Sequence, residues 1–353
     1  MGNDSASMLS GITVCIAEDR ASCEPALRIL VASLTRRSPG IRALLFCPNA
    51  TPSFAKWISD FPHCSLNPCA LDGVWTKYDI KPLALLTALR TGADDVLWID
   101  SDVLIARDFR PVFAELSVET LAVTEEALSG GRADPDGMRA RMWGMPVGRS
   151  LPFTANTGVI RVTTAHIELL EAWHDLLQSP EYRAAQAAPW YERESHLAGD
   201  QEVLTALLSS SRFSDIPIRF LRRGPDIVQF FGTSGYTVAE RIGHLRTGLP
   251  YFIHSQGFRP WWPSDEPVVG WSARFRALYN DMSPYTTLAR GYASSLDCDR
   301  WLSSQSKHGR ALAALTPDNA PLTGLPLALI SDTVRIAKTV SGRWKNRLGA
   351  RQP

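Results

Sequence analysis

The first hundred residues alternate between short apolar segments and longer segments with helical periodicity. The apolar segments have the length of strands and cover residues 11–17 (GITVCIA), 41–48 (IRALLFCP) and 93–100 (ADDVLWID). The helical segments cover residues 23–37, 51–60 and 81–90, and each has a proline near its start, where a helix tolerates it. This alternation predicts βαβ units and therefore an α/β, Rossmann-like fold, in which helices flank a mainly parallel sheet.

The pattern changes in the second half of the chain. Residues 129–150 combine glycines, prolines and charges, so we expect a long loop that closes over a binding site. A strand is predicted at residues 156–162 (NTGVIRV), and helices at residues 163–178 and from residue 199 onward. Beyond residue 288 the periodicity weakens, until residues 330–351 regain it. We therefore expect a main domain over residues 11–288 and a C-terminal helical appendage over residues 289–353.

Composition argues against several classes of protein. The 353 residues are 45% apolar, which suffices for a large core, and a net charge of +1 argues against nucleic-acid binding through bulk positive charge. The six cysteines have no CxxC spacing, which argues against a zinc site and favours buried, reduced thiols. No signal peptide is recognisable at the start, and no segment has the roughly 18 apolar residues of a membrane span. We therefore expect a cytoplasmic protein that binds no nucleic acid.

Two aspartates follow one of the predicted strands, in the stretch VLWIDSDVLI. Asp100 and Asp102 are separated by one residue, so on a strand they would point to the same side and repel each other. The carboxyl ends of parallel strands are also where sheets of this kind bind ligands. A hard divalent cation, Mn²⁺ or Mg²⁺, prefers carboxylate and phosphate oxygens and would remove the repulsion. The alternative is an exposed Asp-Ser-Asp turn that binds nothing.

Four segments resemble, in the same order, the nucleotide-sugar glycosyltransferases of the GT-A fold. Within that fold they resemble the retaining group that contains glycogenin and the lipopolysaccharide galactosyltransferases. The segments lie within residues 11–285 and are the D-x-D stretch VLWIDSDVLIARDF, the N-x-G-V strand NTGVIRV, the D-Q segment GDQEVL and the H-x-x-G-x-R-P-W segment in FIHSQGFRPW. The last segment is one residue shorter than the family pattern, and Arg259 replaces a lysine. An arginine still binds a diphosphate, although its forked geometry differs.

The resemblance implies a metal-dependent glycosyltransferase with a GT-A catalytic domain over residues 11–288. Such an enzyme moves a sugar from a nucleoside-diphosphate sugar, with UDP as the family's usual nucleotide, to a glycan or glycolipid acceptor with retention. The implied ligands of Mn²⁺ or Mg²⁺ are Asp100, Asp102 and His254. The implied residues beside the donor sugar are Asn156, Asp200 and Gln201, and we expect a front-side reaction without a covalent intermediate. The cation would neutralise the charge that grows on the β-phosphate as the glycosidic bond breaks.

Further residues are candidates for donor binding on the basis of charge and position. Arg259 and Lys77 would add positive charge near the diphosphate, and Gly257 would let the backbone approach it closely. Glu18 and Asp19 follow the first strand and would meet the base or the ribose. Each has a simpler alternative, because lysines are usually exposed and acidic residues often precede helices for capping alone.

Two other functions compete with a glycosyltransferase. A sugar-phosphate nucleotidyltransferase would share the parallel sheet but should have a glycine-rich loop after the first strand, where this chain reads AEDRASCEPA. A non-catalytic module that binds sugar nucleotides or glycans would need only part of the site. Turnover of the donor in the presence of Mn²⁺ separates an enzyme from such a module.

The C-terminal segment of residues 330–351 has a basic, amphipathic pattern. Apolar residues, Trp344 among them, recur at helical spacing. The segment contains six basic residues and a single acidic one, Asp332. Such a helix suits the interface of an anionic bilayer, so we expect peripheral association with the inner face of a membrane. A terminal helix docked on the main domain, or a frayed tail, is the alternative.

Overall fold

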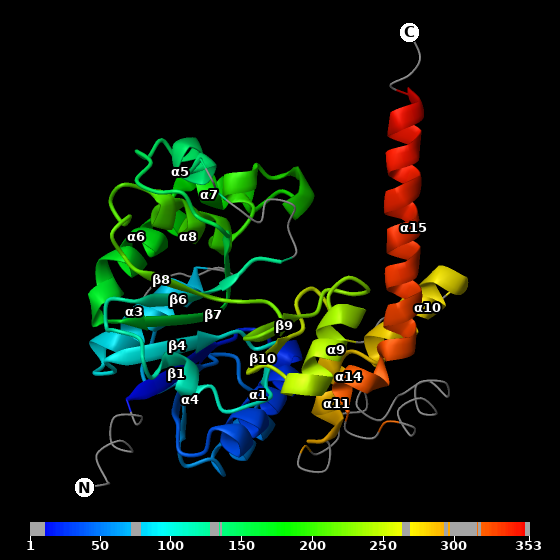
Figure 1. Ribbon diagram of the computed structural model, residues 1–353. Helices are drawn as coiled ribbons and strands as arrows, with labels where there is room; N and C mark the ends of the chain where they lie inside the picture. The colour runs from blue at the N-terminus through cyan, green and yellow to red at the C-terminus, as the bar shows by residue number, and fades with distance from the viewer. Residues whose placement is uncertain are drawn as a thin grey trace, which may run out of the picture.

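A seven-stranded sheet runs through the centre of the molecule (Figure 1). The computed structural model describes residues 11–71, 79–127, 134, 136–262, 269–292, 296, 316 and 319–349, without the side chains of residues 340–349. The strand order is β3-β2-β1-β4-β7-β6-β8. The strands are β1 (Ile12–Ala17), β2 (Arg42–Phe46), β3 (Cys64–Leu66), β4 (Asp95–Ile99), β6 (Leu121–Glu125), β7 (Ala155–Thr163) and β8 (Ile218–Leu221). All run in one direction except β7, which is antiparallel to β4 and β6. The predicted α/β class with a mainly parallel sheet is confirmed.

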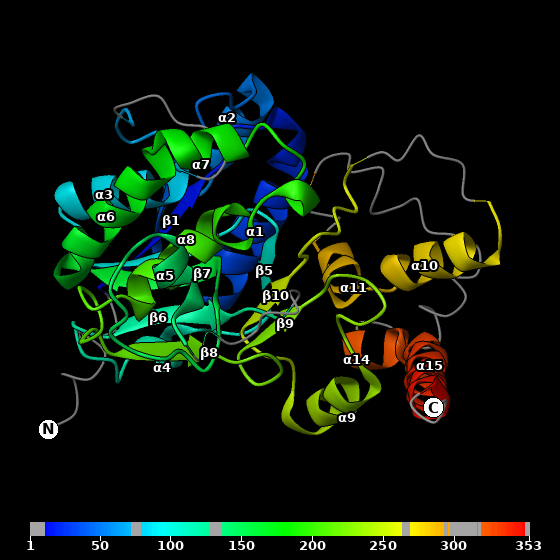
Figure 2. The same cartoon turned by 90° about the horizontal axis from the view of Figure 1, so that it is seen from above.

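Helices cover both faces of this sheet (Figures 1 and 2). On one side lie α1 (Glu24–Arg37) and α2 (Pro52–Ile58), and on the other α3 (Ile80–Arg90), α6 (Ile167–Gln178) and α8 (Asp200–Ser209). Strand β4 links the two layers, because Val96 and Trp98 pack with the second group of helices and Leu97 and Ile99 with the first. Successive strand side chains point to opposite faces, so burial on both faces requires the continuous apolar run of β4.

A second, three-stranded sheet lies at the edge of the central one. It consists of β5 (Val103–Ile105), β10 (Phe252–His254) and β9 (Ile227–Gln229), in that order. β10 pairs antiparallel with β5, and in this register His254 lies opposite Val103. The pairing therefore brings residues about 150 positions apart in the sequence next to each other, and it places His254 beside the aspartate pair.

The described C-terminal part is helical, and its last two helices lie wholly within the predicted appendage of residues 289–353. Its helices are α9 (Val238–Thr247), α10 (Trp271–Asp281), α11 (Pro284–Arg290), α14 (Ala320–Thr323) and α15 (Leu325–Gly349). They share a hydrophobic cluster with α1, in which Ile29 packs with residues such as Tyr279, Tyr285 and Leu327. α15 begins earlier than the predicted segment of residues 330–351, and its C-terminal half projects away from the rest of the molecule (Figure 1).

Within residues 129–150, where we predicted a long loop, the described residues are mainly turns and coil, but they include one short helix that the prediction missed. Residues 138–142 form the short helix α5 (Met138–Met142), which packs on α8. Arg139 is buried there and forms ion pairs with Asp134 and Glu202. The ion pairs of Arg139 thus hold charges of this segment inside the fold, which local composition does not reveal. Residues 129–133 and 135 lie outside the described residues.

Composition also predicted buried, reduced cysteines and no membrane-spanning segment. The five cysteines in the described part of the chain are free thiols, and Cys15, Cys23 and Cys47 are buried. Among the helices that the structure describes, none combines the length and the apolarity needed to cross a bilayer. The two remaining α-helices of the described chain, α4 (Arg110–Phe113) and α7 (Pro180–Ala185), are short, and each contributes a buried residue to the core, Phe113 and Tyr182.

Candidate functional site

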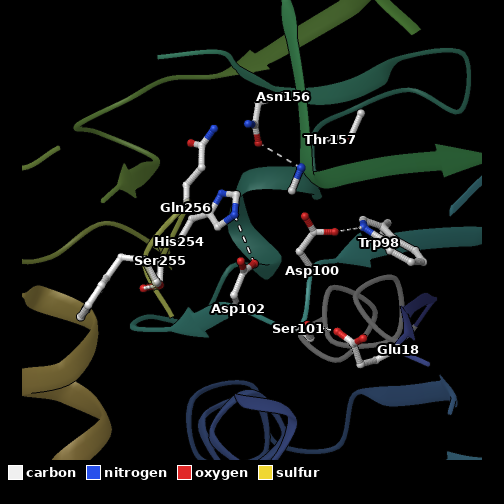
Figure 3. A network of polar contacts seen from close by, with 12 residues as sticks. Glu18, Trp98, Asp100, Ser101, Asp102, Asn156, Thr157, His254, Ser255 and Gln256 are labelled. Atoms are coloured by element: carbon white, nitrogen blue, oxygen red, sulfur yellow. Dashed lines mark hydrogen bonds and ion pairs between the residues drawn. The ribbon is translucent and has the colours of Figure 1, made fainter. Parts of the chain in front are cut away.

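The two aspartates lie in the turn that connects the two sheets. β4 ends at Ile99 and β5 begins at Val103, so the expected alternation along one strand does not apply. The turn is closed by a hydrogen bond from the Val103 amide to the Asp100 carbonyl (3.0 Å). The Asp100 amide donates to the carbonyl of Gly158 on β7 (2.9 Å). Both carboxylates point into the same space because the turn bends the chain between the sheets (Figure 3).

Asp100, Asp102 and His254 form a cluster with the spacing of a metal site. Their potential ligand atoms lie within 4.8 Å of one another. His254 Nε2 is 3.2 Å from Asp102 Oδ1, as Figure 3 shows, and the buried Nδ1 has no hydrogen-bond partner among the described residues. Two carboxylates and an imidazole are ligands that suit Mn²⁺, so the residues present fit the predicted cation.

The protonation of these groups reflects their burial and their mutual proximity. Burial, and then the charge of Asp102, raises the pKa of Asp100, although Lys81 and His254 favour its ionised form. Burial also works against ionisation of Asp102, but His254 and Arg259 hold its pKa below the ordinary value. Burial opposes a charged imidazole at His254, yet Asp102 raises its pKa. Asp102 and His254 thus each favour the charged form of the other.

Gly158 makes room for the imidazole. A Cβ atom at this position would lie 2.7 Å from Cε1 and 2.8 Å from Nδ1 of His254. The glycine of the NTGV segment is therefore explained by packing, since any side chain would displace the third candidate ligand. The sequence alone does not indicate this contact, because His254 follows about 100 residues later.

Lys81 is a central residue of the site that the sequence analysis did not identify. Its side chain is almost fully buried, with Nζ 3.0 Å from Asp100 Oδ1, 3.3 Å from Asp200 Oδ2 and 2.9 Å from Thr157 Oγ1. Burial opposes its charge, but Asp100 and Asp200 raise its pKa, so it is an ammonium ion. A clue was present, because α3 is otherwise apolar up to Arg90 and starts at the ligand-binding edge of the sheet. The predicted lysine, Lys77, lies outside the described residues.

The other candidates for binding the donor sugar are held in a network of amides and carboxylates. Asp200, the first residue of α8, accepts a hydrogen bond from Thr157 Oγ1 (2.6 Å). Asn156 Oδ1 accepts from the Gly158 amide (3.0 Å), and Asn156 Nδ2 donates to Glu126 (2.9 Å). Gln201 Oε1 is 3.5 Å from the same Nδ2 atom. Asn156, Asp200 and Gln201 are therefore brought together, and Glu126 is a buried member that the sequence analysis missed.

Glu18 connects the turn with the end of β1. Its Oε2 accepts a hydrogen bond from Ser101 Oγ (2.6 Å) and its Oε1 one from Arg20 Nε (2.6 Å). Burial works against its ionisation, but Arg20 and Ser101 keep its pKa below the ordinary value. Glu18 thus lies beside Ser101, with both of its oxygens already bound. Asp19 is partly exposed, and the contact recorded for it is a hydrogen bond from Asn49 to its carbonyl (2.9 Å).

Arg259 and Arg20 bring positive charge to the opposite side of the turn. The Arg259 guanidinium lies 4.4 Å from the centre of the Trp262 ring, and that of Arg20 lies 5.9 Å from it. Gly257 is exposed and has a φ of +73°, a conformation that favours glycine. The segment around His254 therefore combines a candidate metal ligand, a turn that requires glycine and a cation.

A cavity of about 430 Å³ opens at the carboxyl ends of β2 and β3. Phe46, Asn67, Cys69 and Leu71 are among its lining residues. It is connected to the aspartate turn through Glu18, whose amide donates to the Phe46 carbonyl (3.0 Å). The cavity and the metal cluster therefore lie along the same edge of the sheet.

No protein-family model matches the chain, and no curated protein matches it. Solved structures similar to it include the bifunctional glycosyltransferase WbbM (13% identity, TM-score 0.44, 71% of this chain and 47% of WbbM covered). Galactosyltransferase LgtC, in complex with donor and acceptor sugar analogues, is 14% identical with a TM-score of 0.47. The match covers 85% of this chain and 99% of LgtC. The glycosyltransferase GlyE from Streptococcus pneumoniae is 17% identical with a TM-score of 0.44, and the match covers 80% of this chain and 63% of GlyE. The chain thus spans about half of WbbM. All three of these proteins are described as glycosyltransferases.

Proposed function

We propose that this chain is a metal-dependent glycosyltransferase of the GT-A type that uses a nucleoside-diphosphate sugar as donor. The observation that carries the proposal is the convergence of Asp100, Asp102 and His254, whose ligand atoms lie within 4.8 Å of one another. Next to them lie three more charged groups, Lys81, Asp200 and Glu18. An excess of carboxylates at the ligand-binding edge of the sheet is the environment in which a divalent cation and a diphosphate complement each other.

Mn²⁺, or Mg²⁺, would be held by Asp100, Asp102 and His254 and would supply Lewis-acid stabilisation of the leaving diphosphate. Arg259 and Arg20 add positive charge for the same oxygens. The cavity lined by Phe46 and Asn67 has room for the nucleoside and lies along the same edge, so we assign the base to it. Lys77, Gly257 and Asp19 remain proposed donor-binding residues.

Asn156, Asp200 and Gln201 would surround the sugar at its reacting carbon. Asp200 is hydrogen-bonded by Thr157 and ion-paired with Lys81, so its negative charge is held in place and partly compensated. A carboxylate in this state is better suited to stabilising a positively charged, oxocarbenium-like sugar than to forming a covalent bond. This supports transfer with retention on the front side of the sugar, with a glycan or glycolipid as acceptor.

We further propose that residues 11–288 are the catalytic unit and that residues 289–353 are an extension attached to it. The shared hydrophobic cluster between α1 and the C-terminal helices gives this attachment its packing.

The experiment that tests the function is a screen of nucleoside diphosphates and their sugars for thermal stabilisation, with and without Mn²⁺. A ligand that binds the folded chain raises its melting temperature by mass action. Donors that stabilise only with Mn²⁺ are then tested for transfer and hydrolysis. Asp102→Ala should lower turnover at least about 100-fold, because the loss of one charged ligand removes transition-state stabilisation of this size.

Asp60→Asn is the matched control, since Asp60 is an exposed acidic residue at the end of α2. Nucleotide binding without turnover would favour a binding module. Activity of Asp102→Ala within a few-fold of the wild type, at saturating Mn²⁺, would contradict the metal site.

A further inference from the structure

We propose that the groove between α10 and α15 is a docking surface for an anionic lipid bilayer. The groove has a volume of about 660 Å³ and is distinct from the metal cluster. This proposal does not rest on the proposed glycosyl transfer, because the residues of the groove are separate from those of the candidate metal site. Membrane binding can also be measured without turnover. The expected basic segment of residues 330–351 contributes only part of the lining, and α10 contributes another part.

The apolar part of the groove is unusually exposed for a folded protein. Trp271 is 82% exposed and Val334 is 48% exposed, and they line the groove with Phe275 and Ile330. Exposed apolar side chains that gather on one surface mark an interaction site more often than scattered ones do. A tryptophan is the side chain that most favours the boundary between lipid and water. Trp271 therefore has the chemistry of an interfacial anchor.

The charged part of the groove is cationic. Arg276, Arg335 and Lys338 line it, and none of the described residues that line it is acidic. Asp332, outside the lining, forms an ion pair with Arg335 (2.9 Å) and accepts a hydrogen bond from the Val238 amide. Asp332 thus interacts with Arg335, and Arg276 and Lys338 are the other basic residues that line the groove. Apolar side chains rimmed by cations complement lipid headgroups that carry negative charge.

The arrangement of α15 presents this surface outward. Its first turns are fixed to the body, where Leu327 and Ala328 are buried and Ser331 donates to the Thr233 carbonyl. From residue 333 to residue 339 every described side chain is exposed. The helix has 25 residues and is therefore about 37 Å long, so much of it extends beyond the body, as Figure 1 shows. A bilayer would bury the apolar stripe that the protein itself leaves uncovered.

Co-sedimentation of the full-length chain with lipid vesicles tests the proposal. We expect binding to vesicles of equal parts phosphatidylcholine and phosphatidylglycerol, much weaker binding to pure phosphatidylcholine, and a loss of binding as salt is added. Trp271→Ala should reduce the bound fraction several-fold. Trp190→Ala is its matched control, because Trp190 is 73% exposed and does not line the groove.

Charge is tested with the double variant Arg276→Glu and Lys338→Glu, which should lower partitioning at least about ten-fold. The double variant Arg37→Glu and Lys56→Glu, with exposed sites on α1 and α2, makes the same change of charge outside the groove. The proposal is overturned if anionic vesicles bind no protein, or if the groove variants bind as well as their controls. Self-association that Trp271→Ala abolishes, without vesicle binding, would assign the groove to a second copy of the chain and would also overturn it.

Discussion

Two single residues of this site, Lys81 and Gly158, determine the surroundings of their neighbours, the first through its charge and the second through its lack of a side chain. Lys81 lies between Asp100 and Asp200, so one ammonium ion serves a candidate metal ligand and a residue placed beside the sugar. Gly158 acts by lacking a side chain, since its Cα faces the His254 ring. Both residues lie outside the D-x-D pattern, yet the geometry of Asp100 and His254 depends on them.

Gly158→Ala is expected to weaken metal binding without unfolding the chain. The added methyl group would lie within 3 Å of the imidazole and would force His254 away from Asp102. A change of this kind next to a metal ligand lowers affinity by roughly 10- to 100-fold. The measurement is a calorimetric titration with Mn²⁺. Gly243→Ala is the control, because nothing lies within 4 Å of a Cβ atom there. Equal midpoints for both variants would show that His254 is not a ligand.

At the scale of elements, β7 connects the site at its start with a capped turn at its other end. β7 is fully buried over nine residues and carries Asn156, Thr157 and Gly158 past the end of β4. After β7 the chain enters a 3-10 turn (Thr164–His166) with a capping box, in which the Thr163 amide donates to His166 Nδ1 (3.0 Å). His166 Nε2 lies 3.1 Å from the Glu119 carbonyl, so the ring joins two segments.

We expect His166 to make the folded chain less stable in mild acid. Burial lowers its pKa below the ordinary value of 6.5, so the folded chain keeps it neutral while the unfolded chain takes up a proton. Stability therefore falls as the pH drops below about 6.5, because the unfolded state binds more protons. His166→Gln, which keeps an acceptor for the Thr163 amide but does not titrate, should show a shallower fall.

Chemical denaturation at several pH values between neutral and about 5 measures this slope. His63→Gln is the control, because His63 is exposed and its replacement should leave the slope as in the wild type. An identical slope for His166→Gln and the wild type would mean that other groups cause the acid sensitivity.

At the scale of the whole molecule, a buried arginine joins the C-terminal helices to one another. Arg241 on α9 is 0% exposed and donates from Nη1 to the carbonyls of Ala320 (3.1 Å) and Pro321 (3.0 Å). Its guanidinium lies 4.3 Å from the centre of the Tyr236 ring. A Cβ atom at Gly324 would lie 2.6 Å from Nη2, so the chain between α14 and α15 passes close to this side chain. Arg241 thus contributes to fixing the base of α15, together with the buried Leu327 and Ala328.

Arg241→Leu is expected to release α14 and the first turns of α15. The loss of hydrogen bonds from a charged donor to buried carbonyls costs about 3 kcal/mol or more of the free energy of unfolding. Amide hydrogen exchange should accelerate at residues 319–331 more than in the central sheet. Arg246→Leu, at an exposed position on the same helix, should leave exchange unchanged. Uniform acceleration throughout the chain would show that Arg241 stabilises the whole fold and not this attachment.

The sequence by itself determined the elements whose pattern is local. The alternation of apolar and amphipathic segments predicted strands and helices that recur as β1, α1, β2, α2, α3 and β4. The aspartate pair, NTGV, DQ and the histidine segment pointed to residues that the fold places near one another. Local pattern suffices for these features because side-chain periodicity follows directly from helix and strand geometry.

Only the tertiary structure decided features that depend on contacts between distant segments. The reversal of β7, the turn at Asp100–Asp102, the closing of residues 138–142 into a helix and the central position of Lys81 all belong to this group. Lys81 meets Asp200 across 119 positions of the chain, and Arg139 meets Glu202 across 63. Lysine and arginine side chains are usually solvated, yet Lys81 and Arg139 are both buried and paired with carboxylates. Pairing of buried charges depends on which elements pack together, and the local sequence does not encode that.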